Sequence, residues 1–353
     1  MTALPPGGTI GILGGGQLGR MLAMAAARLG YRTIVLDPDP LAPAAQVSTE
    51  HIVAAYDDPA ALDALAAADV VTYEFENVPA AAAARIAGKA PLHPSVAALA
   101  AAQDRIAEKR MIEGAGLAVA PHATVDDAPS LGAARAALGT IVLKTRRLGY
   151  DGKGQRVLRE GDDGAAALAA LGGRDLVAEK RVPLDAELSV IAVRGADGET
   201  ITFDPARNEH RDGILHRSTV PSGLSPGIEA AAREAALRIA DALDYRGALG
   251  VEFFVSDGAL LVNEIAPRVH NSGHWTEAAC AIDQFEAHIR AVAGLPLGDG
   301  SRHSDCVMEN LLGDAVRDAP WSEPNVRVHL YGKREARPGR KMGHWTRISA
   351  SRD

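Results

Sequence analysis

Two acidic residues lie inside apolar, strand-like runs in the last third of the chain. Glu252 lies in GVEFFV, Asn263 and Glu264 lie in LLVNEIA, and SDGA separates the two runs. Acids in such runs are costly unless they are paired or bind a cation, because burial removes the water that solvates their charge. Carboxylate and amide oxygens form the ligand set that Mg²⁺ prefers. The sequence therefore predicts a β-hairpin with a Mg²⁺ site at Glu252 and Glu264.

The turn of this hairpin decides which side chain faces Glu252. A loop at Asp257–Ala259 puts Glu264 opposite Glu252 with Cβ atoms ~5 Å apart. A two-residue turn at Asp257 and Gly258 puts Asn263 there instead. Both registers gather oxygen ligands. The structural alternative is a pair of edge-strand acids that face water.

Residues 148–156, LGYDGKGQR, form a glycine-rich segment between strand-like runs. Three glycines and Lys153 predict a flexible β-hairpin flap whose backbone N–H groups and ammonium suit nucleotide phosphates. The segment is not a P-loop, because G-x-x-x-x-G-K-[ST] is absent. An exposed hairpin turn with incidental charge is the alternative.

Two further segments carry charges that could receive anions. In PRVHNSGHW (267–275), Arg268, His270 and Asn271 follow the acidic hairpin directly, where a cation could hold an anionic substrate. His270 and His274 have the spacing of a zinc pair on a helix, but Pro267 and the Asn-Ser-Gly run favour a loop, so we do not expect zinc there. The tail YGKREARPGRKMGH (331–344) is basic. Its composition fits a phosphate clamp as well as it fits a solvated surface, and a nuclear-localisation segment is also possible.

A glycine fingerprint near the start of the chain suggests a different enzyme class. Gly14, Gly16 and Gly19 in TIGILGGGQLGR match G-x-G-x-x-G, and Asp37 follows at the distance expected of a ribose-binding acid in a dinucleotide fold. An NAD(P)-linked oxidoreductase is therefore one hypothesis. It gives no role to Glu252, to Glu264 or to the glycine-rich segment.

The elements that position these residues change character along the chain. The first hundred residues alternate strand-like and helix-like runs, which predicts a doubly wound parallel sheet. Ala-rich runs such as VAALAAAQDRIAEKRM have helical periodicity and predict scaffold helices. TIVLKTRR and DLVAEKRV predict strands around the glycine-rich segment. Short strands follow Glu187, with helices at about 226–244 and 283–293 and a strand-rich tail.

Bulk composition narrows the class of protein. The chain has 353 residues, 47% hydrophobic and 23% charged, and a formal charge of −8, which argues against a nucleic-acid binder. Cys280 and Cys306 form no disulfide framework and indicate a reducing compartment. No signal peptide or membrane span is expected from the first residues. We expect a cytoplasmic protein.

The motifs GGGQLGRM, LGYDGKGQ, NEIAPRVHNSGHW and RPGRKMGH, in this order, resemble the ATP-grasp superfamily. Within it they are similar to the N5-carboxyaminoimidazole ribonucleotide synthetases, over nearly the whole chain. The resemblance implies an α/β and α+β ATP-grasp fold with an N-terminal doubly wound, Rossmann-like pre-ATP-grasp domain at 1–108. It implies a small lid domain with the flap at 109–186 and a C-terminal catalytic domain at 187–353.

The resemblance also implies a ligase of purine biosynthesis. Bicarbonate attacks the γ-phosphate of ATP, and the resulting carboxyphosphate carboxylates 5-aminoimidazole ribonucleotide. ATP and Mg²⁺ are the expected cofactors, and a homodimer is the family expectation. A sister ATP-grasp enzyme, such as the formate-dependent glycinamide ribonucleotide transformylase, would share the ATP residues but not RVHNSGHW with RPGRKMGH. A non-catalytic binding module has no positive support.

The resemblance assigns site residues in four groups. The ATP contacts are Arg105, Lys144, Gly149, Tyr150, Asp151, Gly152, Lys153, Gly154, Gln155, Glu179, Lys180, Arg181, Val182, Glu187, His210, Asn263 and Glu264. The Mg²⁺ ligands are Glu252 and Glu264. The ribonucleotide contacts are Gly14, Gly15, Gln17, Leu18, Glu76, Asp151, Lys333 and Arg340. The catalytic residues are Asp151, Arg268, His270, Asn271 and Lys333.

Overall fold

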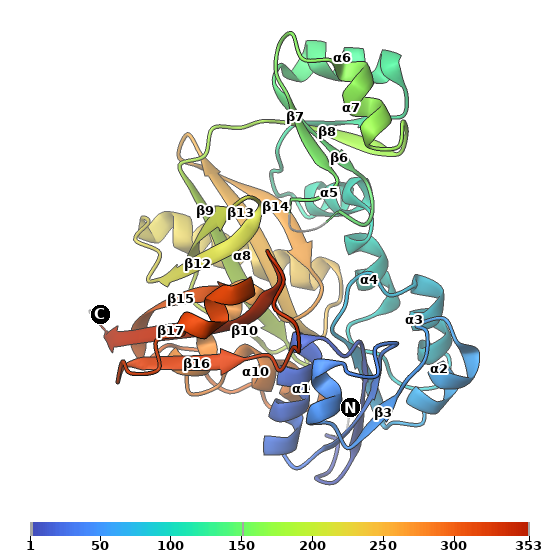
Figure 1. The fold of residues 1–353 in the computed structure, drawn as a ribbon, viewed down its shortest axis with the longest axis vertical. Coiled ribbons are helices and arrows are strands. Elements are labelled where there is room, and N and C mark those ends of the chain that lie inside the picture. The colour runs from blue at the N-terminus through green and yellow to red at the C-terminus, as the bar shows by residue number, and fades with distance from the viewer. Residues whose placement is uncertain (1–2, 150–151, 352–353) are drawn as a thin grey trace.

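The N-terminal sheet is parallel, as the alternation of strands and helices predicts. A computed structural model describes residues 3–149 and 152–351 (Figure 1). The strand order β3-β2-β1-β4 places the first strand next to the second and the fourth, as in doubly wound folds. The strands are β1 (Thr9–Leu13), β2 (Arg32–Leu36), β3 (Glu50–Ile52) and β4 (Val70–Tyr73). The helices are α1 (Gln17–Arg28), η1 (Pro43–Gln46), α2 (Pro59–Leu65) and α3 (Ala80–Ala87).

One predicted Ala-rich helix is two helices. VAALAAAQDRIAEKRM forms α4 (Val96–Ala102) and α5 (Arg105–Gly114), separated at Gln103 and Asp104. The Asp104 carboxylate accepts hydrogen bonds from the backbone N–H groups of Ile106 and Ala107 at 3.0 and 3.2 Å, so a new helix begins there. This break places Arg105 in the first turn of α5, at the edge of the site described below.

A small four-stranded sheet with order β5-β8-β6-β7 holds the glycine-rich segment. Its strands are β5 (His122–Val125), β6 (Ile141–Thr145), β7 (Gln155–Leu158) and β8 (Leu176–Lys180), with helices α6 (Ala128–Leu138) and α7 (Gly164–Ala170). The segment is the turn between antiparallel β6 and β7, as a hairpin flap requires. The run DLVAEKRV forms β8, on the other side of β6. In Figure 1 this unit stands apart from the rest of the molecule.

The remaining strands form one nine-stranded sheet with the path β14-β13-β9-β11-β12-β15-β17-β16, and β10 pairs with β9. The strands are β9 (Ala186–Arg194), β10 (Thr200–Thr202), β11 (Ala206–Arg211), β12 (Ile214–Val220), β13 (Gly247–Ser256), β14 (Ala259–Ala266), β15 (Ser304–Leu312), β16 (Val326–Leu330) and β17 (Lys341–Ala350). The helices are α8 (Pro226–Ala242), η2 (Asn271–Gly273), α9 (Thr276–Ala279), α10 (Gln284–Ala293) and η3 (Gly313–Asp318). The strand-rich tail is therefore part of the central sheet.

Two helices join the N-terminal sheet to this body. Helix α1 packs against α10, and one buried core runs through both, including Met21, Leu22, Phe285 and Ile289. Burial of such side chains stabilises the contact by roughly 1.5–3 kcal/mol each. The glycine turn before α1 and the loop before α10 are thereby held in fixed positions. Within the described ranges, no helix is long and apolar enough to cross a membrane.

Candidate active site

The acidic hairpin is β13 and β14, and Glu252 pairs directly with Glu264. Ser256 pairs with Ala259, so the turn consists of Asp257 and Gly258. That short turn alone would bring Asn263 opposite Glu252. A register shift after Glu252 leaves Asn263 without a partner in the ladder, which brings Glu264 into line. The three-residue loop expected for this register is therefore wrong, and a β-bulge achieves the same pairing.

The two facing carboxylates have different electrostatic surroundings. Arg105 donates to Glu264 at 2.8 Å and, with the other cations nearby, outweighs burial and lowers the pKa of Glu264. Burial, and then the charge of Glu264, raise the pKa of Glu252 to about 7. His270 Nε2 lies 3.5 Å from a Glu252 oxygen. Burial, and then Arg268, lower the pKa of His270 to about 3, so its ring is neutral and does not offset the charge of Glu252.

These residues fit a magnesium ion. Glu252 has a carboxylate as its cross-strand neighbour, and the Oδ1 atom of Asn263 is buried without a hydrogen-bond partner among the described residues. A divalent cation would relieve the repulsion between the acids and use the unpaired amide oxygen. We take this unpaired oxygen beside two carboxylates as the structural sign of a cation site.

A buried ion cluster joins α5 to strands β6 and β8 of the small sheet. Lys144 donates to Glu179 at 2.8 Å, and Lys109 Nζ lies 3.2 Å from the other Glu179 oxygen. Burial alone would raise the pKa of Glu179, but Lys144 and then Lys109 lower it to about 2. The expected adenine linker follows on β8 and the residues after it, where the N–H groups of Lys180 and Arg181 bond to Pro121 and Thr140. Val182 is half-buried.

Sequence reasoning missed Lys109 and Glu108, which both lie on α5. Lys109 is buried against Glu179, and Glu108 accepts a hydrogen bond from the N–H of Ile265 at 2.7 Å. Burial, and then Glu264, raise the pKa of Glu108 to about 8. Their signal was present, because Arg105, Glu108 and Lys109 follow one another at the helical spacing i, i+3 and i+4. The helix break at Asp104 is needed to place the side chains of Glu108 and Lys109 in the interior.

The flap adjoins this cluster. Arg105 Nη2 donates to the carbonyl of Gly149 at 3.3 Å, so Arg105 contacts both the flap and Glu264. Gly152 and Gly154 have φ values of +73° and +71°, which explains glycine at these positions. Gln155 begins β7, and Lys153 lies within the turn. Tyr150 and Asp151 lie outside the described residues.

The predicted ribose ligand and its histidine neighbour are joined. Glu187 on β9 and His210 on β11 form an ion pair between half-buried side chains. Burial lowers the pKa of His210, but the bond to Glu187 outweighs it and raises the pKa overall. β9 lies next to β13 in the large sheet, and β11 lies on the other side of β9. The structure thus groups Glu187 and His210 with Glu252.

Arg268 is paired with an acid from the N-terminal sheet. Its guanidinium donates two hydrogen bonds to Glu76, one of them at 2.7 Å. The pKa of Arg268 is raised: burial opposes this, but Glu76 outweighs it. Asn271 is buried, and neither polar atom of its side chain has a partner among the described residues. Arg268, His270 and Asn271 therefore bring one cation, one neutral imidazole and one unpaired amide to the end of the acidic hairpin.

The N-terminal glycine turn is already occupied by the protein's own acids. The N–H of Gly15 donates to Asp37 and the N–H of Gly16 donates to Glu74, both at 2.7 Å. These two N–H groups are therefore hydrogen-bonded within the chain. Asp37 also accepts from the Tyr56 hydroxyl at 2.7 Å, so its carboxylate is used internally. Of the other expected contacts here, Gly14 and Leu18 are buried and Gln17 is half-buried.

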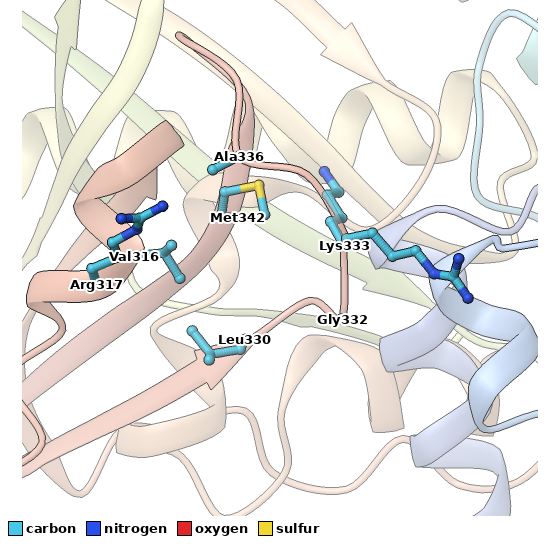
Figure 2. Close-up of a pocket in the computed structure, with 8 residues that line it drawn as sticks. Val316, Arg317, Leu330, Gly332, Lys333, Ala336 and Met342 are labelled. Atoms are coloured by element: carbon cyan, nitrogen blue, oxygen red, sulfur yellow. The ribbon is translucent and has the colours of Figure 1, made fainter.

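The basic tail reaches the N-terminal domain. Gln46 of η1 donates to the carbonyl of Gly332 at 2.9 Å. Lys333 donates to the carbonyl of Lys341 at 2.7 Å, and Arg340 donates to the carbonyl of Glu335 at 3.1 Å. A pocket of about 280 Å³ lies here, and Leu330, Lys333 and Met342 are among the residues that line it (Figure 2).

The architecture and this site define an ATP-grasp enzyme with a pre-ATP-grasp domain. Residues 8–103 match the ribonucleotide synthetase preATP-grasp domain, residues 110–285 the ATP-grasp domain, and residues 306–353 the phosphoribosylaminoimidazole carboxylase C-terminal domain. The chain is 59% identical over 354 residues to the N5-carboxyaminoimidazole ribonucleotide synthase of Brucella melitensis, covering 98% of each. It therefore belongs to the N5-carboxyaminoimidazole ribonucleotide synthase family.

Solved structures agree with this assignment. The ADP complex of an N5-carboxyaminoimidazole ribonucleotide synthetase has a TM-score of 0.95 at 44% identity, covering 99% of this chain and 94% of the other. The Aspergillus clavatus enzyme, in complex with ADP and 5-aminoimidazole ribonucleotide, has a TM-score of 0.91 at 34% identity, covering 98% and 94%. The ATP-grasp fold expected from the sequence motifs is confirmed, and the NAD(P)-linked hypothesis is excluded.

Proposed function

We propose that this chain carboxylates 5-aminoimidazole ribonucleotide to N5-carboxyaminoimidazole ribonucleotide, with ATP and bicarbonate as co-substrates, in purine biosynthesis. The observation that carries the proposal is the pairing of Glu252 with Glu264, followed directly by Arg268, His270 and Asn271. A cation-binding acid pair beside an anion-receiving loop suits transfer of a phosphoryl group to bicarbonate. Membership of the family supplies the identity of the acceptor.

Mg²⁺ would be held by Glu252 and Glu264 with Asn263 beside them, and it would neutralise charge on the transferring phosphoryl group. Lys144 and Arg105 lie where they would hold the phosphates, since both belong to the ion clusters around Glu179 and Glu264. The flap would cover ATP with Gly149, Gly152, Lys153, Gly154 and Gln155, and would exclude water from the reactive carboxyphosphate.

The ribonucleotide would lie between the N-terminal domain and the tail. Arg268 would receive bicarbonate, and its pair with Glu76 links this step to the ribonucleotide side of the site. His270, with its lowered pKa, would act as a neutral hydrogen-bonding group, and Asn271 would supply its unpaired amide. We assign the ribonucleotide phosphate to Lys333 and Arg340. Asp151, outside the described residues, would orient or deprotonate the exocyclic amine.

The remaining assignments are part of the same proposal. The adenine would contact Glu179, Lys180, Arg181 and Val182, and the ATP ribose would contact Glu187 beside His210. The domain boundaries 1–108, 109–186 and 187–353, a homodimer and a cytoplasmic location follow the family expectation.

ADP release tests the proposal. The purified chain is assayed with MgATP and bicarbonate, with and without 5-aminoimidazole ribonucleotide. We expect the ribonucleotide to stimulate ADP release strongly and the stimulation to require bicarbonate. ADP release that ignores the ribonucleotide would reject the proposed acceptor. In Asp151→Asn, we expect coupled turnover to fall far more than ATP binding, and unchanged carboxylation would reject the role of Asp151.

A further inference from the structure

Three side chains from separate parts of the chain meet beneath the tail. Glu277 lies on α9, and His329 and His344 are directly paired across β16 and β17. The two imidazole rings stack with centroids 5.4 Å apart and an interplanar angle of 22°. Cross-strand pairing fixes both rings on one face of the β16–β17 ribbon, which Figure 1 shows at the edge of the large sheet. None of the three has a role in the proposed reaction.

Two of the three distances in this cluster suit ligands of one ion. Glu277 Oε2 lies 3.2 Å from His329 Nδ1 and 3.5 Å from His344 Nε2, and the three ligand atoms lie within 4.8 Å of one another. Two ligands bound to one Zn²⁺ in tetrahedral geometry are roughly 3.3 Å apart, given metal–ligand bonds of about 2.0–2.1 Å. A charge-assisted hydrogen bond would instead bring nitrogen and oxygen to about 2.7–2.9 Å.

An unpaired oxygen points to the same conclusion. Glu277 Oε2 is buried and has no hydrogen-bond partner among the described residues. A buried carboxylate oxygen without a hydrogen bond is costly, because it has lost its water and gained no donor. A cation between Glu277 and the two rings would compensate for that cost.

His344 is held as metal-binding histidines usually are. Its Nδ1 lies 2.9 Å from the hydroxyl oxygen of Tyr331, which is fully buried. If Nδ1–H donates to that oxygen, Nε2 keeps its lone pair on the side of Glu277. The ring of His274 stacks on His344 with centroids 4.8 Å apart, which fixes the plane of the imidazole.

We propose that Glu277, His329 and His344 bind a divalent transition-metal ion, Zn²⁺ in preference to Mg²⁺. Two imidazole nitrogens and one carboxylate suit Zn²⁺, whereas Mg²⁺ prefers oxygen ligands. The ion joins the β16–β17 ribbon to α9, which follows the loop of His270 and Asn271. It fastens the tail that carries Lys333 and Arg340 to the body of the protein. This site is separate from the acid pair of Glu252 and Glu264.

Metal titration tests the proposal. Full-length, tag-free protein is stripped with a chelator, dialysed into Mg²⁺-free buffer and titrated with Zn²⁺ by calorimetry. We expect one Zn²⁺ per chain, with affinity reduced at least about 100-fold in His329→Gln and Glu277→Gln. His303→Gln, which changes an exposed histidine outside the cluster, is the matched control and keeps the wild-type affinity. Absence of stoichiometric binding by the wild type, or undiminished binding by folded His329→Gln, would overturn the proposal.

A second measurement, on the wild type and on Glu264→Gln, tests the proposal even if His329→Gln fails to fold. Cobalt(II) replaces Zn²⁺ in the stripped wild type and in Glu264→Gln, which leaves the new cluster intact. We expect the strong visible bands of a cobalt site with few ligands in both proteins. Weak bands of a six-coordinate, all-oxygen site, or loss of the bands in Glu264→Gln, would place the metal at the acid pair and overturn the proposal.

Discussion

Two glycine-rich turns in this molecule look equivalent in sequence and differ in what surrounds them. In the N-terminal turn, Gly15 and Gly16 donate their N–H groups to Asp37 and Glu74, and both acids are buried. In the flap, Gly149 and Gly154 lie between β6 and β7, with Thr145 beside both and Arg105 beside Gly149. The N–H groups of the first turn bond to the protein's own carboxylates, whereas the flap lies beside Arg105, which pairs with Glu264.

The difference shows that a glycine pattern indicates backbone freedom and not the identity of a ligand. An anion approaching the N-terminal turn would meet two acids that already use its N–H groups. An anion approaching the flap would meet Arg105 and, on β6, Lys144. The N–H groups of Gly15 and Gly16 are therefore used within the chain, and we propose that the nucleotide phosphates lie under the flap.

We expect the largest effect from a change in the acid pair of Glu252 and Glu264, which lies beside Arg105 and the flap. Glu264→Gln removes one of the two facing acids and the ion pair with Arg105. We expect coupled ADP release to fall by about 10²–10³-fold, because charge on the transferring group loses its counterions. The measurement is steady-state turnover at saturating MgATP. Glu234→Gln, an exposed acid on α8, is the control and should keep full activity. Turnover of Glu264→Gln within threefold of wild type would contradict the role.

Alanine substitutions in the two turns should separate their functions. In Gly154→Ala, the new Cβ would lie 2.7 Å from Thr145 Oγ1 in a backbone with φ of +71°. We expect the KM for ATP to rise about tenfold while the free energy of unfolding falls by only ~1–2 kcal/mol, the cost of one strained residue. Kinetics with varied ATP and urea unfolding provide the two measurements. An unchanged KM for ATP would contradict a role of the flap in ATP binding.

The matched substitution in the N-terminal glycine turn should lower the stability of the fold instead. In Gly15→Ala, the Cβ would lie 2.8 Å from the Cβ atoms of Ala42 and Asp37. We expect the free energy of unfolding to fall by about 1–3 kcal/mol from overpacking, with the KM for ATP unchanged. A large rise in the KM for ATP without loss of stability would show that this turn, too, binds the nucleotide.

The smallest expected effect is a pH dependence of the free energy of unfolding, which arises from Glu74 at the N-terminal glycine turn. Burial raises the pKa of Glu74 to about 7, although the N–H of Gly16 opposes the shift. Because this value exceeds the unfolded pKa near 4.3, the folded chain binds more protons between these pH values. The free energy of unfolding contributed by Glu74 therefore falls as pH rises from about 5 to 7, then levels off. Relative to Glu74→Gln, wild type should lose roughly 1–3 kcal/mol between pH 5 and pH 8. Parallel curves for the two proteins in urea would contradict the shift.

Local patterns in the sequence were enough to predict the hairpin acids, the flap and the parallel N-terminal sheet. These features depend on alternation, glycine spacing and neighbours close in sequence. The register of Glu252 against Glu264 was not predictable, because it depends on a bulge at Asn263 that no turn rule supplies. The inward placement of Lys109 was missed because it requires the helix to restart at Asp104.

Contacts between distant segments were also beyond sequence patterns. Glu76 and Arg268 are 192 residues apart, and their ion pair exists only because the N-terminal sheet packs on the body. The two acids that close the N-terminal turn come from the ends of β2 and β4, so the fingerprint could not reveal that its N–H groups were already used. The cluster of Glu277, His329 and His344 likewise needs the tail to join the large sheet.

Isotope transfer is the direct test of whether bicarbonate attacks the γ-phosphate of ATP at this site. The chain is incubated with MgATP, 5-aminoimidazole ribonucleotide and ¹⁸O-labelled bicarbonate, and the inorganic phosphate is analysed by mass spectrometry. Attack by bicarbonate leaves its bridging oxygen on phosphorus when CO₂ departs from carboxyphosphate. We expect one ¹⁸O atom from bicarbonate in each phosphate released. Carboxylated product accompanied by phosphate without ¹⁸O would contradict it.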